Sequence, residues 1–125
     1  MGDYQAIAQQ FTEFYYKTFD ADRAQLAPLY RDNSMLTFEA KPFQGTATII
    51  GQLVDLPFKR IEHQVATVDA QPSNDQGGIL VIVSGVLLVE EERRPMSYTQ
   101  TFQLLPESGN YYVFNDIFRL VYPAA

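Results

Sequence analysis

The sequence predicts a single α+β domain in which three N-terminal helices pack on a strongly curved antiparallel sheet. Apolar residues recur at helical spacing over the first part of the chain, whereas β-rich stretches separated by turn residues fill the part from Lys59 onward. This order favours helices that cover one face of an antiparallel sheet, and the curve of the sheet should form a hydrophobic cavity. The chain has 125 residues and no long linker, so we expect one domain, 1–125.

Three helices are expected before the main sheet. The first begins after an N-cap at Asp3 and runs to about Phe19, with apolar residues three and four apart at Tyr4, Ile7, Ala8, Phe11, Phe14, Tyr15 and Phe19. Asp22 caps a short second helix that carries Leu26, Leu29 and Tyr30 and ends at the sequence DNS. Thr46 caps a third helix that carries Ile49, Ile50 and Leu53 and stops at Pro57.

A short strand is expected at 35–39, followed by a turn in the sequence AKPFQG. Four longer strands are expected at 59–70, 79–91, 96–105 and 111–122. The segments QPSNDQGG, EERRP and PESGN separate them and are typical of hairpin connections. The last four strands therefore form an antiparallel meander.

The composition excludes several classes of function. A net charge of −6 argues against a nucleic-acid partner and favours a basic protein surface. The chain has no cysteine, one histidine and no Gly-rich phosphate loop, so we expect no disulfide, metal site or cofactor, and a location in the cytosol or nucleus. The longest apolar run, ILVIVSGVLLV, is too short for a membrane span, and we expect a soluble protein.

Proton transfer by carboxylates is the enzymatic chemistry that this composition still allows, because burial in an aromatic cavity raises the pKa of an acid. Glu39, Asp116 and His63 are the candidate groups. Asp116 alternates with Phe114 and Phe118 in the last strand and should share their face. It is either catalytic or a structural carboxylate that accepts hydrogen bonds from backbone or Tyr groups. His63 is either functional or a half-exposed strand residue.

The stretch LTFEAKPFQG places an aromatic side chain directly before an acid. Successive side chains of a regular strand point to opposite faces, so Phe38 and Glu39 cannot both face the cavity. Phenylalanine is far more often buried than glutamate. We therefore expect Phe38 in the cavity wall and Glu39 on its rim, which favours docking of a partner over catalysis.

The chain resembles the nuclear transport factor 2 family along nearly its whole length. The resemblance is carried in order by FTEFYYKTFDADRAQL, LTFEAKPFQG, LPFKRIEHQ, DAQP and YYVFNDIFRL. It implies a homodimer of cone-shaped subunits that carries the GDP-bound form of the small GTPase Ran into the nucleus and binds phenylalanine-glycine repeats of nuclear pore proteins. It also implies that no reaction is catalysed and that the protein is found in the cytoplasm, in the nucleus and at the nuclear pore.

In this family an aromatic side chain of Ran enters the mouth of the cavity, and acids at the rim pair with basic Ran residues. The resemblance implies a polar rim of Glu39, His63 and Glu91, and a cavity lined by Phe38, Leu56, Ile61, Leu88, Met96, Val113 and Phe118. A second rim acid of the family aligns with Arg93, which reverses the charge, and Glu90 or Glu92 would supply that contact after a small shift of the loop.

The resemblance also implies that Tyr4 contributes to the nucleoporin site, although helical spacing alone makes Tyr4 a core residue. The homodimer has a physical reason as well, since three helices cannot cover both faces of the sheet and an apolar outer face needs a partner. Two alternatives stay open at this point. One is a small isomerase or dehydratase that uses cavity carboxylates on the same fold, and the other is a scaffold or partner subunit in messenger-RNA export.

Overall fold

The computed structural model describes residues 3–57, 60–90 and 94–121. The elements are α1 (Tyr4–Ala21), the 3-10 helix η1 (Arg23–Leu29), β1 (Tyr30–Phe38), β2 (Lys41–Gln44), α2 (Thr46–Val54), β3 (Ile61–Pro72), β4 (Ile79–Val89), β5 (Met96–Glu107) and β6 (Asn110–Leu120). The predicted α+β class is confirmed, with three helical segments before the main strands. Within the described ranges, no helix combines the length and hydropathy needed to cross a membrane.

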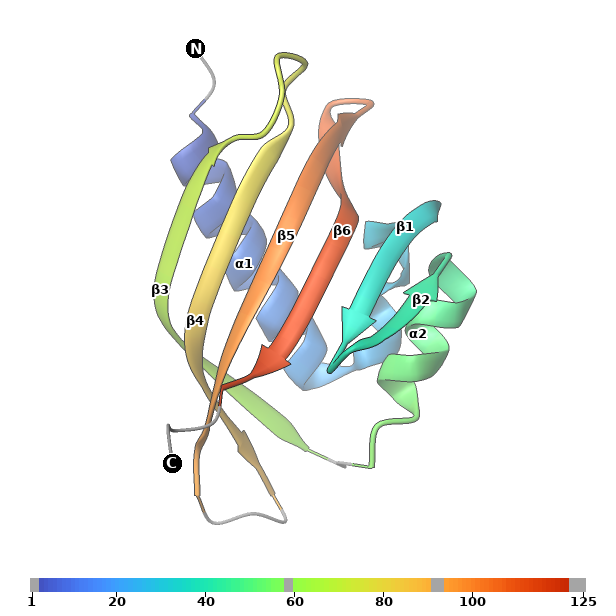
Figure 1. The fold of residues 1–125 in the computed structure, drawn as a ribbon, viewed down its shortest axis with the longest axis vertical. Helices are drawn as coiled ribbons and strands as arrows, with labels where there is room; N and C mark the ends of the chain where they lie inside the picture. Colours follow the sequence, from blue (N-terminus) through green and yellow to red (C-terminus); the bar gives the residue numbers. More distant parts are fainter. Residues whose placement is uncertain (1–2, 58–59, 91–93, 122–125) are drawn as a thin grey trace.

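The strands form one sheet in the order β2-β1-β6-β5-β4-β3. Figure 1 shows α1 lying across the face of strands β3 to β6, with α2 beside the β1-β2 hairpin. The sheet is mixed, whereas the sequence predicted an antiparallel one, because β1 pairs in parallel with β6. A helix and four further strands separate β1 from β6 in the chain, so no tight turn forces these two strands into opposite directions.

The predicted first helix is confirmed, but one of its side chains lies on a different face from the one predicted. The Asp3 carboxylate accepts a hydrogen bond from Ala6 N at 3.4 Å and acts as the expected N-cap. The buried stripe of α1 holds Ala8, Thr12, Tyr15, Tyr16 and Phe19. Phe14 was expected in that stripe but is 54% exposed, because the helix turns it away from the sheet while Thr12 and Tyr16 turn inward.

The connecting segments differ in detail from the sequence prediction. Asp22 caps the second helix as expected, through a bond from Ala24 N at 3.2 Å, but the helix is a 3-10 helix with Pro28 inside it. The N-cap of α2 is Gly45, at φ +90°, rather than Thr46. The segment expected as a turn contains the edge strand β2, which the positive φ angles of Glu39 and Ala40 fold back onto β1.

A bulge and a glycine help to bend the long strands. The register of β3 against β4 shifts between Val65 and Thr67, which leaves Ala66 without an opposite residue. Gly85 of β4 faces this bulge, and a Cβ at Gly85 would collide with the backbone carbonyl of Gln64. Only glycine fits where the two backbones approach so closely. The sheet can therefore curl around α1 at this point.

A buried hydrogen-bond network joins α1 to the strands beneath it. Asp116, 1% exposed, accepts a bond from Tyr30 Oη at 2.8 Å and one from Gln100 Nε2 at 2.8 Å. Tyr15 Oη lies 2.8 Å from Tyr30 Oη and 3.4 Å from Asp116 Oδ2, and Tyr16 Oη donates to Gln100 Oε1 at 2.8 Å. Every polar atom of Asp116 and Gln100 thus has a partner, as a buried polar group requires.

Burial raises the pKa of Asp116 from 3.8 to about 6, although the bonds from Gln100, Tyr30 and Tyr15 oppose the rise. The folded carboxyl keeps its proton to a higher pH than the unfolded one. The free energy of unfolding therefore falls as the pH rises from about 4 through about 6, by about 3 kcal/mol from this one group.

Asp116→Asn should remove this part of the pH dependence, because an amide does not ionise. Relative to the wild type, the free energy of unfolding of the variant should rise by about 3 kcal/mol between about pH 4 and about pH 7. Urea unfolding at a fixed protein concentration measures it, with Asp75→Asn, an exposed acid at the β3-β4 turn, as the matched control. The same pH slope in wild type and Asp116→Asn would contradict the assignment.

Candidate functional site

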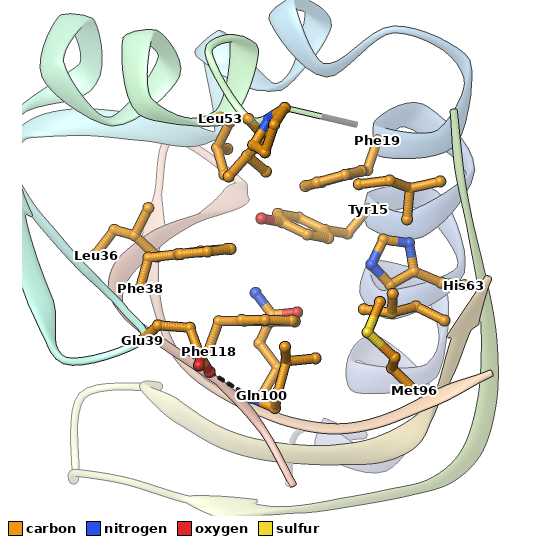
Figure 2. A pocket seen from close by; sticks show the side chains of 15 residues that line it. Tyr15, Phe19, Leu36, Phe38, Glu39, Leu53, His63, Met96, Gln100 and Phe118 are labelled. Atoms are coloured by element: carbon orange, nitrogen blue, oxygen red, sulfur yellow. Dashed lines mark hydrogen bonds between the residues drawn. The ribbon is translucent and has the colours of Figure 1, made fainter. Parts of the chain in front are cut away.

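The curl of the sheet leaves a cavity of about 250 Å³ between α1, α2 and the concave face. Figure 2 shows side chains from both helices and from the strands pointing into it. It is lined by Tyr15, Phe19, Leu36, Phe38, Glu39, Leu53, Leu56, Pro57, Ile61, His63, Leu87, Met96, Gln100, Phe118 and Leu120. We call the half-buried and exposed residues among these, apart from His63, the mouth: Phe38, Glu39, Leu56, Pro57, Met96 and Leu120.

Most of the predicted cavity residues lie in this lining. They are Phe38, Leu56, Ile61, Met96 and Phe118. The rings of Phe38 and Phe118 stack at 4.8 Å with an interplanar angle of 7°, and together they form one side of the cavity. The partner strands β1 and β6 place these two residues directly opposite each other.

Two predicted cavity residues lie elsewhere. The prediction for Leu88 is wrong because side chains alternate along β4. Leu87 rather than Leu88 faces the cavity, opposite Met96 of β5. The prediction for Val113 is also wrong. This residue pairs with Leu104 of β5, next to an irregularity in the pairing of the two strands. Its side chain is fully buried in the core instead of lining the cavity.

Glu39 lies at the mouth, as expected, but for a different reason. It follows β1 in a left-handed conformation, with φ +51°, so the alternation of a regular strand does not set its direction. Its backbone N donates to Phe118 O at 3.1 Å, and its Oε1 accepts from Leu120 N at 2.5 Å. Figure 2 shows this bond to the last residue of β6. The carboxylate thus anchors β6 and also places negative charge at the opening.

The side chain of His63 lies in the wall of the cavity, while the residue as a whole is half-buried. Its side chain is 3% exposed, and the ring stacks on Tyr16 at 4.6 Å. The carboxylate of Asp20 holds it from behind, with Oδ1 2.7 Å from Nδ1 and Oδ2 accepting from His63 N at 2.9 Å. The third expected rim residue, Glu91, falls outside the described residues, as do Glu92 and Arg93.

Sequence reasoning missed more than half of the lining. The missed residues are Tyr15, Phe19, Leu36, Leu53, Pro57, Leu87, Gln100 and Leu120. Some of them carried a usable signal, since Leu36 and Leu120 alternate with Phe38 and Phe118 on the same strands. Gln100 carried none, because nothing local marks a glutamine that tertiary hydrogen bonds hold in a core.

Asp116 does not line the cavity, and it lies behind the wall that Tyr15 and Gln100 form. Burial raises the pKa of Tyr15 well above 10, so its hydroxyl keeps its proton at physiological pH. The structural interpretation of Asp116, as a carboxylate that accepts Tyr hydrogen bonds, therefore matches the geometry. Within the described part of the chain, no group of three or more acids and histidines is arranged to hold a metal ion.

Tyr4 lines a separate groove at the start of α1. The groove also involves the β3-β4 turn and β6, through Ile7, Pro72, Asn74, Asp75, Gly77, Gly78, Ile79 and Tyr111. Tyr4 is half-buried and packs against the core as well, so the expectation from helical spacing also fits its position.

The sheet face that α1 leaves uncovered is partly apolar. Ile82, Thr101 and Ile117 lie side by side across β4, β5 and β6. Ile82 is 49% exposed, Ile117 is 51% exposed, and Leu80 of the same strand as Ile82 is 37% exposed. We call Leu80, Ile82 and Ile117 the outer patch.

Comparisons with known proteins agree with this architecture. A family model described as the nuclear transport factor 2 (NTF2) domain matches residues 7–120. The chain is 82% identical over 125 residues to nuclear transport factor 2 of Davidiella tassiana, with 100% of both chains covered. It is 63% identical over 125 residues to nuclear transport factor 2 of Emericella nidulans, with 99% of this chain and 100% of that one covered.

A solved structure extends the likeness to three dimensions. Nuclear transport factor 2 (Ntf2) from Cryptosporidium parvum superposes with a TM-score of 0.89 at 37% identity, and the match covers 94% of each chain. The same family is indicated by the α+β fold, by the identity over the full length and by the match of the family model. The chain belongs to the nuclear transport factor 2 family.

Proposed function

We propose that this protein is a nuclear import carrier that binds the GDP-bound form of Ran and phenylalanine-glycine repeats of nucleoporins. It would move between cytoplasm and nucleus through the nuclear pore, and it would act as a carrier without catalysing a reaction. The observation that carries the proposal is a ring-sized apolar cavity with the Glu39 carboxylate at its mouth, in a chain of this family.

The cavity suits an aromatic side chain of the partner. A protein cavity of roughly 150 Å³ is enough to hold benzene, so the 250 Å³ found here holds one ring with little strain. Burying such a ring contributes roughly 1.5–3 kcal/mol. Stacked Phe38 and Phe118 offer it an aromatic wall, and Met96 offers a polarizable sulfur. The cavity should therefore supply most of the affinity.

Charge supplies selectivity for a basic partner. Glu39 places a carboxylate at the mouth, and the whole chain carries a net charge of −6. Exposed ion pairs typically contribute below about 1 kcal/mol each, so they mainly speed the encounter and reject acidic partners. Binding should consequently weaken as salt is added.

The first test is titration calorimetry with Ran loaded with either nucleotide. We expect binding to Ran-GDP and much weaker binding to Ran-GTP. Glu39→Gln should weaken binding about fivefold, with a smaller effect at high salt, because it removes the charge but keeps an oxygen for Leu120 N. This substitution is cleaner than Glu39→Lys, which also removes the bond that anchors β6.

The control is Glu13→Gln, which removes an exposed acid from α1 and should leave the affinity unchanged. Thermal unfolding of each variant excludes a loss of fold. Equal affinity for the two nucleotide states, or no binding to either, would contradict the proposed function.

The groove around Tyr4 is the proposed nucleoporin site. Tyr4, Ile7, Ile79 and Tyr111 offer apolar and aromatic surface to a phenylalanine side chain, and Pro72 closes one side. A flexible repeat that inserts one ring at a time binds each groove weakly, and many repeats together then bind with useful strength.

Tyr4→Ala should weaken the binding of a phenylalanine-glycine repeat peptide about tenfold, because it removes an aromatic contact from the groove. Phe14→Ala is the matched control, since Phe14 is an exposed aromatic on the same helix outside the groove. Peptide titration followed by NMR gives both affinities. Equal losses in the two variants would argue against a site at Tyr4.

The outer patch is the proposed surface of a homodimer. Leu80, Ile82 and Ile117 would otherwise present a row of apolar side chains to water on the face that the described helices leave uncovered. A second copy of the chain buries them and removes that exposure. The dimer would also keep the mouth of the cavity free, since the cavity lies on the concave side with α1 and α2.

Ile82→Lys should shift the protein from dimer to monomer at micromolar concentration, because a buried lysine in an apolar interface lacks a partner. Sedimentation velocity measures the shift, and Phe14→Lys, which adds the same charge outside the outer patch, should remain a dimer. A wild type that sediments as a monomer would contradict the proposal, and co-purification of a stable companion chain would favour a partner subunit instead.

A further inference from the structure

One polar atom faces the apolar cavity with its hydrogen-bonding capacity unused. Figure 2 shows the ring of His63 in the cavity wall, with one nitrogen turned toward the cavity and the other away from it. Nδ1 is the nitrogen that lies 2.7 Å from Asp20 Oδ1, so Nε2 is the one that faces the cavity. Among the described residues, no hydrogen bond is made to Nε2. The His63 side chain as a whole is 3% exposed.

Asp20 determines what this atom can bind. A carboxylate accepts hydrogen bonds and donates none, so the proton of the Asp20 bond lies on Nδ1. In the neutral ring Nε2 then carries a lone pair and acts as an acceptor. The second bond, from His63 N to Asp20 Oδ2 at 2.9 Å, fixes the carboxylate and with it the orientation of the ring.

The other polar groups of the wall are already paired. Tyr15 Oη bonds Tyr30 and Asp116, while both polar atoms of the Gln100 side chain are engaged by Tyr16 and Asp116. Each of these atoms already has a partner within the protein. Among the described residues that line the cavity behind the mouth, His63 Nε2 is therefore the side-chain polar atom without a protein partner.

We propose that the cavity is a binding site for a small free aromatic molecule with one hydrogen-bond donor, such as a simple phenol. The ring would fill the apolar space beside Phe38 and Phe118, and its hydroxyl would donate to His63 Nε2. Apolar walls with a small number of precisely placed polar groups are the usual form of a small-molecule site. The volume of about 250 Å³ admits one substituted ring.

A comparison of p-cresol with toluene tests the proposal on the isolated protein. A purely apolar cavity prefers toluene, because the hydroxyl of p-cresol must leave water without compensation. A cavity with an acceptor prefers p-cresol, and we expect it to bind about fivefold more tightly than toluene.

Methionine methyl NMR reports the binding directly. The chain has three methionines, and Met96 lines the cavity while Met35 does not. A ring inside the cavity should shift the Met96 methyl resonance and leave that of Met35 unchanged. No shift at Met96 with any of the probes, or tighter binding of toluene than of p-cresol, would overturn the proposal.

His63→Phe should reverse the order of the two ligands, because it keeps an aromatic ring beside Tyr16 and removes the acceptor. Since the readout is the order of two affinities in one variant, a general loss of stability does not imitate it. An unchanged preference for p-cresol in His63→Phe would overturn the proposal.

Asp20→Asn tests the acceptor itself. The remaining carbonyl oxygen can still accept from His63 N, and the new amide then donates to Nδ1, which moves the ring proton to Nε2. Nε2 becomes a donor, so 4-methylanisole, which only accepts, should approach the affinity of p-cresol. Asp22→Asn changes a nearby helix cap that an amide can replace. It should keep the wild-type difference in affinity between p-cresol and 4-methylanisole. An unchanged difference in affinity between p-cresol and 4-methylanisole in Asp20→Asn would also overturn the proposal.

These outcomes are independent of the proposed import function. Phenol binding is measured without Ran, and Ran binding without phenol. If no phenol binds, the cavity can still accept an aromatic side chain of Ran, as the carrier proposal requires. If Ran does not bind, the acceptor in the wall still predicts that p-cresol binds more tightly than toluene.

Discussion

The burial of one carboxylate, Asp116, is the constraint on which the rest of the structure depends. A charged or protonated acid inside a core is tolerated only when its oxygens are satisfied, and here Tyr30, Tyr15 and Gln100 satisfy them. These partners come from β1, α1 and β5, while Asp116 itself belongs to β6. One side chain thereby fixes the position of the long helix on the sheet. The wall of the cavity is the near side of this network.

The cavity persists because its surroundings cannot collapse into it. The Asp116 network holds α1 on one side, and the stacked rings of Phe38 and Phe118 hold β1 against β6 on the other. The bulge opposite Gly85 keeps the sheet curled instead of flat. An open apolar space costs stability, since its lining lacks contacts. A guest ring restores those contacts, so the same feature that weakens the fold favours binding.

The sequence was sufficient for the fold class and for the residues that obey simple periodicity. Helical spacing located α1, alternation placed Phe38 in the cavity, and the family resemblance added Phe118. Alternation does not set the direction of Glu39, which reaches the mouth through its left-handed conformation, and the cavity position that the resemblance implied for Val113 is wrong beside the irregular pairing of β6. The resemblance implied Leu88 in the cavity, but a shift of one residue reverses the face of a strand, and Leu87 is the residue that lines the cavity. The pairing of His63 with Asp20 joins residues 43 positions apart and had no local signal.

The bond between Glu39 and the amide of Leu120 connects events at the mouth with the end of the chain. A basic group that docks there competes with this amide for the same carboxylate. When the carboxylate turns toward the newcomer, the amide proton of Leu120 loses its acceptor and exchanges with solvent faster. Hydrogen exchange at this single backbone position would then register such a change at the mouth without any label.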